Sequence, residues 1–327
     1  MPHSVYPSTS VVKKFNPVKV AVVGVGSVGS TTAYTLLFSD MISEVVLIDI
    51  NRHKAEGESM DLNHAAPSTT GSVVYVGDYS DCADAAIVII TGGANQKPGE
   101  TRMDLAVTNA RILQKIIPEI VRYAPNTILL IATNPVDVLT YVSYKVSGFP
   151  LNRVIGSGTL LDSARLRYHL SQHFNTSSKN VDAFIVGEHG DSSLPVWSHA
   201  RISGISLRDY CEQSQQIYDH KLFHQMYEKT RSAAYDIIER KGYTAYGIAA
   251  GILRIVETIL KDGGSPLTVS IVGNYFGIEQ VALSVPTKLN RNGAYSPVEL
   301  SFDIKEIELI KKSALQIKSV CSTLDFL

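Results

Sequence analysis

The sequence VKVAVVGVGSVGS spans residues 18–30 and joins a β-branched run directly to three glycines, Gly24, Gly26 and Gly29. A short apolar run of this kind predicts a strand that is buried on both faces. The glycines allow a tight turn, a close approach of the backbone to a pyrophosphate, and packing of the next helix against the strand. The N-terminus of that helix offers free N–H groups to the anion. The stretch therefore predicts a dinucleotide-binding turn.

An acidic residue stands where such a turn needs one. Asp49 ends the next predicted strand, 49 − 29 = 20 residues after Gly29. A carboxylate at this spacing accepts hydrogen bonds from the adenosine ribose and repels a 2′-phosphate, so it favours NAD over NADP. The alternative interpretation is a tight turn followed by an acidic residue that ends a strand and binds nothing.

The first half of the chain alternates between short apolar runs and longer amphipathic stretches. The predicted strands are 18–23, 45–49, 85–91, 128–132 and 154–155, and the predicted helices are 27–39, 53–64, 104–123 and 136–145. This alternation predicts an α/β fold in which helices cover both faces of a parallel sheet. Together with the glycine turn it indicates a Rossmann-type, doubly wound sheet.

The rhythm changes after about residue 158. Helices are predicted at 160–173, 218–240, 245–260 and 304–320, and strands at 181–186, 267–272 and 277–285. We expect an N-terminal arm over residues 1–17, a dinucleotide-binding domain over 18–157, and a mixed α+β catalytic domain over 158–327.

Composition excludes several classes of protein. The 327 residues include 30 Lys+Arg and 31 Asp+Glu, and a net charge of −1 provides no basic surface for nucleic acid or membrane lipid. No apolar run approaches the ~20 residues of a membrane-spanning helix, and residues 1–17 lack the apolar centre of a signal peptide. The three cysteines lie far apart, which predicts reduced thiols, a cytoplasmic location and no metal cage.

Four further motifs follow in order: TGGANQKPGETR at 91–102, ATNPVD at 132–137, GSGTLLDSAR at 156–165 and GEHGDS at 187–192. With the glycine turn they make the chain, from residue 18 onward, resemble the lactate/malate dehydrogenase family. The resemblance implies an NAD-dependent enzyme of glycolysis or fermentation that interconverts pyruvate and L-lactate by hydride transfer.

The resemblance implies roles for four catalytic residues. His189 is the proton donor and acceptor, which suits an imidazole because its pKa is near neutral. Asp162 orients that imidazole, and Arg165 binds the substrate carboxylate through two parallel hydrogen bonds. Arg102 polarises the substrate carbonyl from a glycine-rich loop that could close as a lid. Taken alone, Asp162 and Arg165 could form a local ion pair, and Arg102 could be a solvated residue at a helix start.

Gln96 bears on the choice of substrate. Malate dehydrogenases carry an arginine at the matching position, where it offsets the second carboxylate of oxaloacetate. A neutral side chain leaves that charge unpaired, at a cost of several kcal/mol in a closed site, whereas the methyl group of pyruvate brings no charge. Malate or a bulkier 2-hydroxy acid remains an alternative substrate. A Rossmann-type NAD-binding module without catalysis remains an alternative function.

The remaining site residues come from the resemblance alone. Asn134 and Thr244 are expected to line the substrate site. The expected contacts with NAD are Gly24, Gly26, Val28, Gly29, Asp49, Lys54, Tyr79, Gly93, Ala94, Thr133 and Asn134.

The resemblance also implies a homo-oligomer, expected to be a tetramer. Residues 1–17 could clasp a neighbouring subunit or form a disordered tail. Many bacterial members are activated by fructose 1,6-bisphosphate through an arginine and a histidine. Arg167 matches the arginine, but Asp182 stands in place of the histidine. Because a carboxylate repels a phosphate, we expect weak activation or none.

Overall fold

The computed structural model describes residues 18–95, 99 and 101–324. The predicted N-terminal arm therefore lies outside the described residues. The predicted helices are found close to their expected positions, as α1 Ser27–Leu36, α2 Arg52–Ala65, α3 Arg102–Tyr123, α4 Val136–Ser147, α5 Leu160–His173, α7 His220–Lys241, α8 Tyr246–Lys261 and α9 Ile304–Ser322. Helix α6 Leu207–Gln213 was not predicted. Among the described residues no helix has both the length and the apolarity to cross a membrane.

Six parallel strands belong to a nine-stranded sheet. They are β1 Lys19–Val23, β2 Glu44–Ile48, β3 Val73–Val76, β4 Ile87–Ile90, β5 Ile128–Ile131 and β6 Val154–Gly156. Their spatial order is β3-β2-β1-β4-β5-β6, which is the doubly wound arrangement predicted from the sequence. Most of their residues are buried, as expected for strands covered by helices on both faces. Only β3 lies outside the strands predicted for this half.

The sheet continues into the second half of the chain, a connection that the sequence does not predict. Strands β12 Pro266–Tyr275, β13 Ile278–Asn290 and β14 Gly293–Pro297 are antiparallel and extend it beyond β6. Strand β12 joins β6 where Ser270 pairs with Gly156. A Cβ on Gly156 would come within 2.9 Å of the Ser270 Cβ, so the small residue permits the junction.

The predicted strand over residues 181–186 is in fact two strands. β7 Val181–Asp182 pairs with β10 Arg201–Ile202, which also pairs with β11 Ile205–Ser206, whereas β8 Ile185–Val186 pairs with β9 Leu194–Pro195. Side chains at the start of α5 bind the backbone of Ile185. Thr159 Oγ1 donates to the Ile185 carbonyl at 2.5 Å, and Ile185 N donates to Ser163 Oγ at 2.9 Å.

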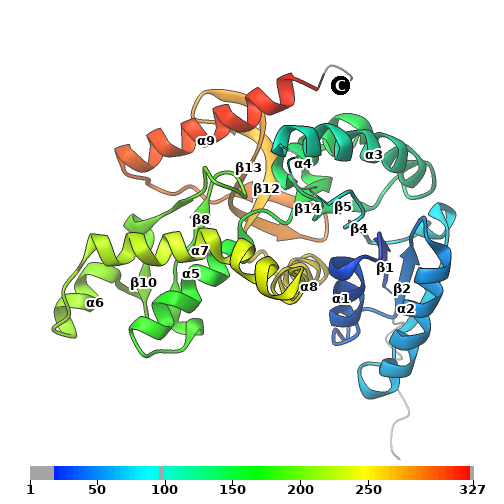
Figure 1. The fold of residues 1–327 in the computed structure, drawn as a ribbon, viewed down its shortest axis with the longest axis horizontal. Coiled ribbons are helices and arrows are strands. Elements are labelled where there is room, and N and C mark those ends of the chain that lie inside the picture. The colour runs from blue at the N-terminus through cyan, green and yellow to red at the C-terminus, as the bar shows by residue number, and fades with distance from the viewer. Residues whose placement is uncertain (1–17, 96–98, 100, 325–327) are drawn as a thin grey trace, which may run out of the picture.

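Figure 1 shows α5, α6 and α7 together on one side of the molecule and α1 and α2 on the other. Helix α8 packs against α1, α4 packs against β12, and α9 packs against β13. A large apolar core surrounds the nine-stranded sheet, and a smaller cluster that includes Phe174 and Phe223 joins α5 to α7. The short 3₁₀ helices are η1 Ala66–Ser68, η2 Tyr79–Cys82, η3 Leu151–Arg153, η4 Ser178–Asn180 and η5 Trp197–His199.

Candidate active site

The glycine turn lies at the carboxyl end of β1, where the strand order reverses between β1 and β4. Gly24 has a φ of +94°, and a Cβ there would lie 2.4 Å from the Gly92 Cα. A Cβ on Gly29 would lie 1.9 Å from the Gly24 carbonyl oxygen. At Gly26, by contrast, a Cβ would meet no described atom within 4 Å. Two glycines therefore permit close packing, and the third leaves backbone open to a ligand.

Asp49 follows β2 directly and faces this turn. Its Oδ2 accepts a hydrogen bond from Val25 N at 2.7 Å, and its Oδ1 accepts one from Asn51 N at 2.8 Å. The carboxylate is thus held beside the glycine turn, as an acid that receives the ribose hydroxyls must be. The turn and Asp49 together fit the adenosine half of a dinucleotide.

Asn109, a buried residue of α3 that the sequence analysis does not single out, joins the loops after β4 and β5. Its Nδ2 donates to the Asn134 carbonyl at 2.7 Å, and its Oδ1 accepts from Ala94 N at 2.7 Å. Thr133 Oγ1 donates to the Gly92 carbonyl at 2.9 Å, and a Cβ on Gly93 would lie 2.4 Å from the Thr133 Cγ2. The predicted cofactor-binding residues of both loops therefore lie side by side, next to the cis peptide bond Asn134–Pro135.

The other predicted cofactor contacts lie near the same edge of the sheet. Val28 is half-buried in the first turn of α1, and Lys54 is exposed in the first turn of α2. Tyr79 is half-buried in η2, and burial raises the pKa of its hydroxyl. Their contacts with NAD stay predictions.

His189, Asp162 and Arg165 lie together. His189 Nδ1 is 2.5 Å from Asp162 Oδ2, and Arg165 Nη1 donates to Asp162 Oδ1 at 3.1 Å. Asp162 and Arg165 come from the first turns of α5, whereas His189 follows β8, so the tertiary fold brings them into contact. The Arg165 and His189 side chains are 14% and 26% exposed, which leaves each partly accessible to a substrate.

The contacts of these three residues shift two pKa values in opposite directions. Burial alone would lower the pKa of His189, but the charge and hydrogen bond of Asp162, together with the charge of Asp137, outweigh it and raise this pKa. Burial alone would raise the pKa of Asp162, but His189 and Arg165 outweigh it and lower that pKa. The pair therefore favours an imidazolium beside a carboxylate.

The turn that carries His189 is held from three elements. His189 N donates to Asp137 Oδ2 of α4 at 2.6 Å, Glu188 N donates to Ser313 Oγ of α9 at 2.8 Å, and Gly187 N donates to the Ser284 carbonyl of β13 at 2.9 Å. Asp137, Ser284 and Ser313 have no role predicted from the sequence. An acid inside the quoted ATNPVD motif is the one signal that could have indicated Asp137.

Arg102 is the first residue of α3. Thr101 caps this helix, with Asp104 N donating to Thr101 Oγ1 at 3.1 Å. The Arg102 guanidinium donates to the Tyr235 hydroxyl of α7 at 2.9 Å and lies 3.2 Å from Asp191 Oδ2. Glu188 Oε1 is 4.0 Å away, so the guanidinium lies beside the turn that carries His189.

The structure does not test two predicted substrate residues. Gln96 lies outside the described residues, as do Lys97, Pro98 and Glu100. Thr244 is half-buried in the connection between α7 and α8. Both assignments stay predictions.

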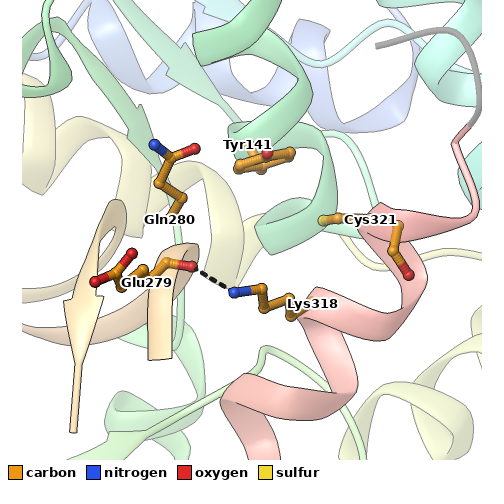
Figure 2. Close-up of a pocket in the computed structure, with 6 residues that line it drawn as sticks. Tyr141, Glu279, Gln280, Lys318 and Cys321 are labelled. Carbon is orange, nitrogen blue, oxygen red and sulfur yellow. Dashed lines mark hydrogen bonds between the residues drawn. The ribbon is translucent and has the colours of Figure 1, made fainter. Parts of the chain in front are cut away.

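Two cavities lie apart from the predicted catalytic residues. One of about 410 Å³ is lined by Ala164, Arg167, Ser178, Lys179, Val181 and Arg254. Burial and the charge of Arg254 lower the pKa of Arg167, while Asp182 opposes the shift. The other, of about 280 Å³, is lined by residues of α4, β13 and α9, among them Tyr141, Gln280 and Cys321 (Figure 2).

The chain matches two family models in succession. Residues 18–156 match the NAD binding domain of lactate/malate dehydrogenase, and residues 159–324 match the alpha/beta C-terminal domain of the same family.

Individual relatives match over nearly the whole chain. A probable L-lactate dehydrogenase of Schizosaccharomyces pombe is 50% identical over 94% of each chain. An L-lactate dehydrogenase of Acetivibrio thermocellus is 51% identical over 94% of this chain and 97% of its own. The solved structure of MGS-M5, a lactate dehydrogenase enzyme from a Medee basin deep-sea metagenome library, superposes with a TM-score of 0.91 at 41% identity, covering 95% of this chain and 99% of that chain.

Proposed function

The chain belongs to the lactate/malate dehydrogenase family, and on this basis we propose that it catalyses the reversible reduction of pyruvate to L-lactate by NADH. The main structural support is the contact of His189 with Asp162 and of Asp162 with Arg165, which joins a proton donor to an anion-binding group. Relatives that are about half identical and carry the name L-lactate dehydrogenase support the choice of substrate.

NAD binds along the carboxyl edge of the parallel strands. The open backbone at Gly26 receives the pyrophosphate, and the Asp49 carboxylate receives the ribose hydroxyls. The loops joined by Asn109 carry Asn134, which would hydrogen-bond to the nicotinamide. When bound, the reduced cofactor supplies a hydride to the carbonyl carbon of the substrate.

His189 supplies the proton that balances the hydride. Asp162 engages Nδ1, so Nε2 of the imidazolium is the nitrogen that faces the carbonyl oxygen. The raised pKa favours the charged form of this ring, and the proton passes from Nε2 to the oxygen as the alcohol forms. In the direction of lactate oxidation, the neutral ring takes the proton back.

The two arginines act on different parts of the substrate. Arg165 is oriented by Asp162 and pairs with the substrate carboxylate through parallel hydrogen bonds. Arg102 begins α3 beside the His189 turn, from which its guanidinium stabilises the negative charge that develops on the carbonyl oxygen. We assign Gln96 and Thr244 to the substrate pocket, where a neutral residue at position 96 disfavours a second carboxylate.

We further propose a cytoplasmic homotetramer that acts in glycolysis or fermentation, with a domain boundary at residues 157–158. Exposed apolar side chains support the assembly, since such groups are commonly covered by another subunit. They include Tyr34, Phe38, Met60, Ile238 and Tyr246. Analytical ultracentrifugation tests the tetramer.

The function is tested by following NADH absorbance with pyruvate, oxaloacetate and 2-oxoisocaproate, each repeated with NADPH. We expect pyruvate with NADH to give the highest kcat/KM. Preference for oxaloacetate or the branched acid would make the enzyme a different 2-hydroxy acid dehydrogenase. Tight binding of NADH without turnover of any 2-oxo acid would indicate a non-catalytic NAD-binding module.

A further inference from the structure

Asp137 is a buried acid for which the mechanism above has no use. It is 2% exposed and lies in the first turn of α4, three residues after Asn134. Its oxygens accept hydrogen bonds from uncharged groups, the main-chain N–H of His189 and the hydroxyl of Ser284. The N-terminus of α4 favours a negative charge at this position. A buried carboxylate is costly, so its placement against the catalytic turn calls for a function.

The contacts of Asp137 link the catalytic turn to two rigid elements. Oδ2 lies 2.6 Å from His189 N, and Oδ1 lies 3.1 Å from Ser284 Oγ. Ser284 also exchanges two main-chain hydrogen bonds with Gly187, at 2.9 and 3.1 Å. One carboxylate thereby ties α4 and β13 to the backbone that carries the imidazole.

We propose that Asp137 is a positioning residue for proton transfer: its buried carboxylate holds the His189 backbone and adds a second negative charge that favours the protonated imidazole. This inference rests on the proposed function, because it assigns Asp137 to the proton transfer that His189 performs.

Charged groups from several elements surround His189 and Asp137. Around His189 they are Asp162 and Arg165 from α5, with Asp137 of α4. Asp162 and Asp137 both favour the charged ring, whereas Arg165 opposes it.

Three groups face Asp137 from other elements. They are Glu188, Tyr275 of β12 and Cys321 of α9. The charge of Glu188 raises the pKa of Asp137, and the charge of Asp137 raises the pKa values of Tyr275 and Cys321. Cys321 lines the cavity of Figure 2, and burial, reinforced by the charge of Asp137, raises the pKa of its thiol to about 12. Burial also raises the pKa of Asp137 to about 6, so its carboxylate is charged near neutral pH and supports His189 there.

The test is the pH profile of Asp137→Asn, which removes the charge and keeps an oxygen that can accept the His189 N–H. Removing a negative charge lowers the pKa of His189, so the alkaline limb for pyruvate reduction moves to lower pH. The variant-to-wild-type ratio of kcat/KM should fall roughly three- to tenfold between about pH 6 and pH 9. For lactate oxidation the acid limb should move to lower pH as well.

Two other variants make the result decisive. Asp61→Asn removes the same charge from an exposed position of α2 and should leave the profile in place. Ser284→Ala removes one of the hydrogen bonds that the Asp137 carboxylate accepts, so it should move the alkaline limb in the same direction by less. If Asp137→Asn does not fold, Ser284→Ala decides the question alone.

The proposal would be overturned if the ratio of kcat/KM for Asp137→Asn to that for the wild type were the same at every pH. A merely structural defect lowers activity without shifting the pH profile. Failure of the wild type with every 2-oxo acid would instead contradict the proposed function.

Discussion

His189 is the residue on which the proposed chemistry depends most directly. We predict that His189→Asn lowers kcat for pyruvate reduction roughly a thousandfold, because asparagine can donate a hydrogen bond but supplies no proton. NADH affinity should change little, since the glycine turn and Asp49 are untouched. Steady-state kinetics and a fluorescence titration with NADH measure the two effects. Near-normal turnover in the variant would remove His189 from the mechanism.

Gln96 carries the proposed discrimination between monocarboxylates and dicarboxylates. In Gln96→Arg the guanidinium offsets the second carboxylate of oxaloacetate, so the ratio of kcat/KM for oxaloacetate to that for pyruvate should rise roughly a hundredfold. Gln96→Asn is the matched control, because it changes the length of the side chain but not its charge. An unchanged ratio in Gln96→Arg would show that this side chain does not face the substrate.

At the scale of elements, two glycines of the β1–α1 turn have different roles: Gly29 is needed for folding, and Gly26 for cofactor binding. Ala at Gly29 would place a Cβ 1.9 Å from the Gly24 carbonyl oxygen, so we predict that Gly29→Ala lowers the free energy of unfolding by about 1–3 kcal/mol. Gly26 has an ordinary φ of −67° and open space around its Cα. Gly26→Ala should therefore fold normally and bind NADH roughly tenfold more weakly, because the new methyl group occupies the ligand side.

Urea denaturation and NADH titration of both glycine variants provide the measurement. Equal losses of stability in the two variants would contradict the assignment of separate roles to these glycines. Unchanged NADH affinity in Gly26→Ala would place the pyrophosphate elsewhere.

At the scale of the whole molecule, the cavity beside Arg167 bears on regulation. Lys179 and Arg254 line it as well. The charge of Asp182 partly offsets the lowering of the Arg167 pKa by burial and by Arg254. We predict that fructose 1,6-bisphosphate barely shifts the pyruvate saturation curve, because Asp182 repels its phosphate. Asp182→His should increase the response. A large leftward shift in the wild type would mean that the three cationic side chains outweigh the carboxylate.

Local sequence patterns predicted most of the helices and parallel strands and the glycine turn at the cofactor edge. Apolar runs and their spacing predicted five of the six parallel strands, and the glycine turn with Asp49 predicted the cofactor edge. The physical reason is that strand burial, helix periodicity and turn geometry depend on neighbouring residues. The pairing of His189 with Asp162 came from the resemblance of whole motifs, and the structure places the two side chains in contact.

Contacts between distant segments were decided by the tertiary structure alone. The division of residues 181–186 into β7 and β8 depends on Thr159 and Ser163. Their side chains, at the start of α5, form hydrogen bonds with the backbone of Ile185 in β8. The Asp137 and Ser284 hydrogen bonds behind the His189 turn join residues 52 and 147 positions apart. Asn109, which joins two loops, and Tyr235, which receives Arg102, belong to the same class. No periodicity encodes such pairs, because they exist only once the packed core has brought the backbones together.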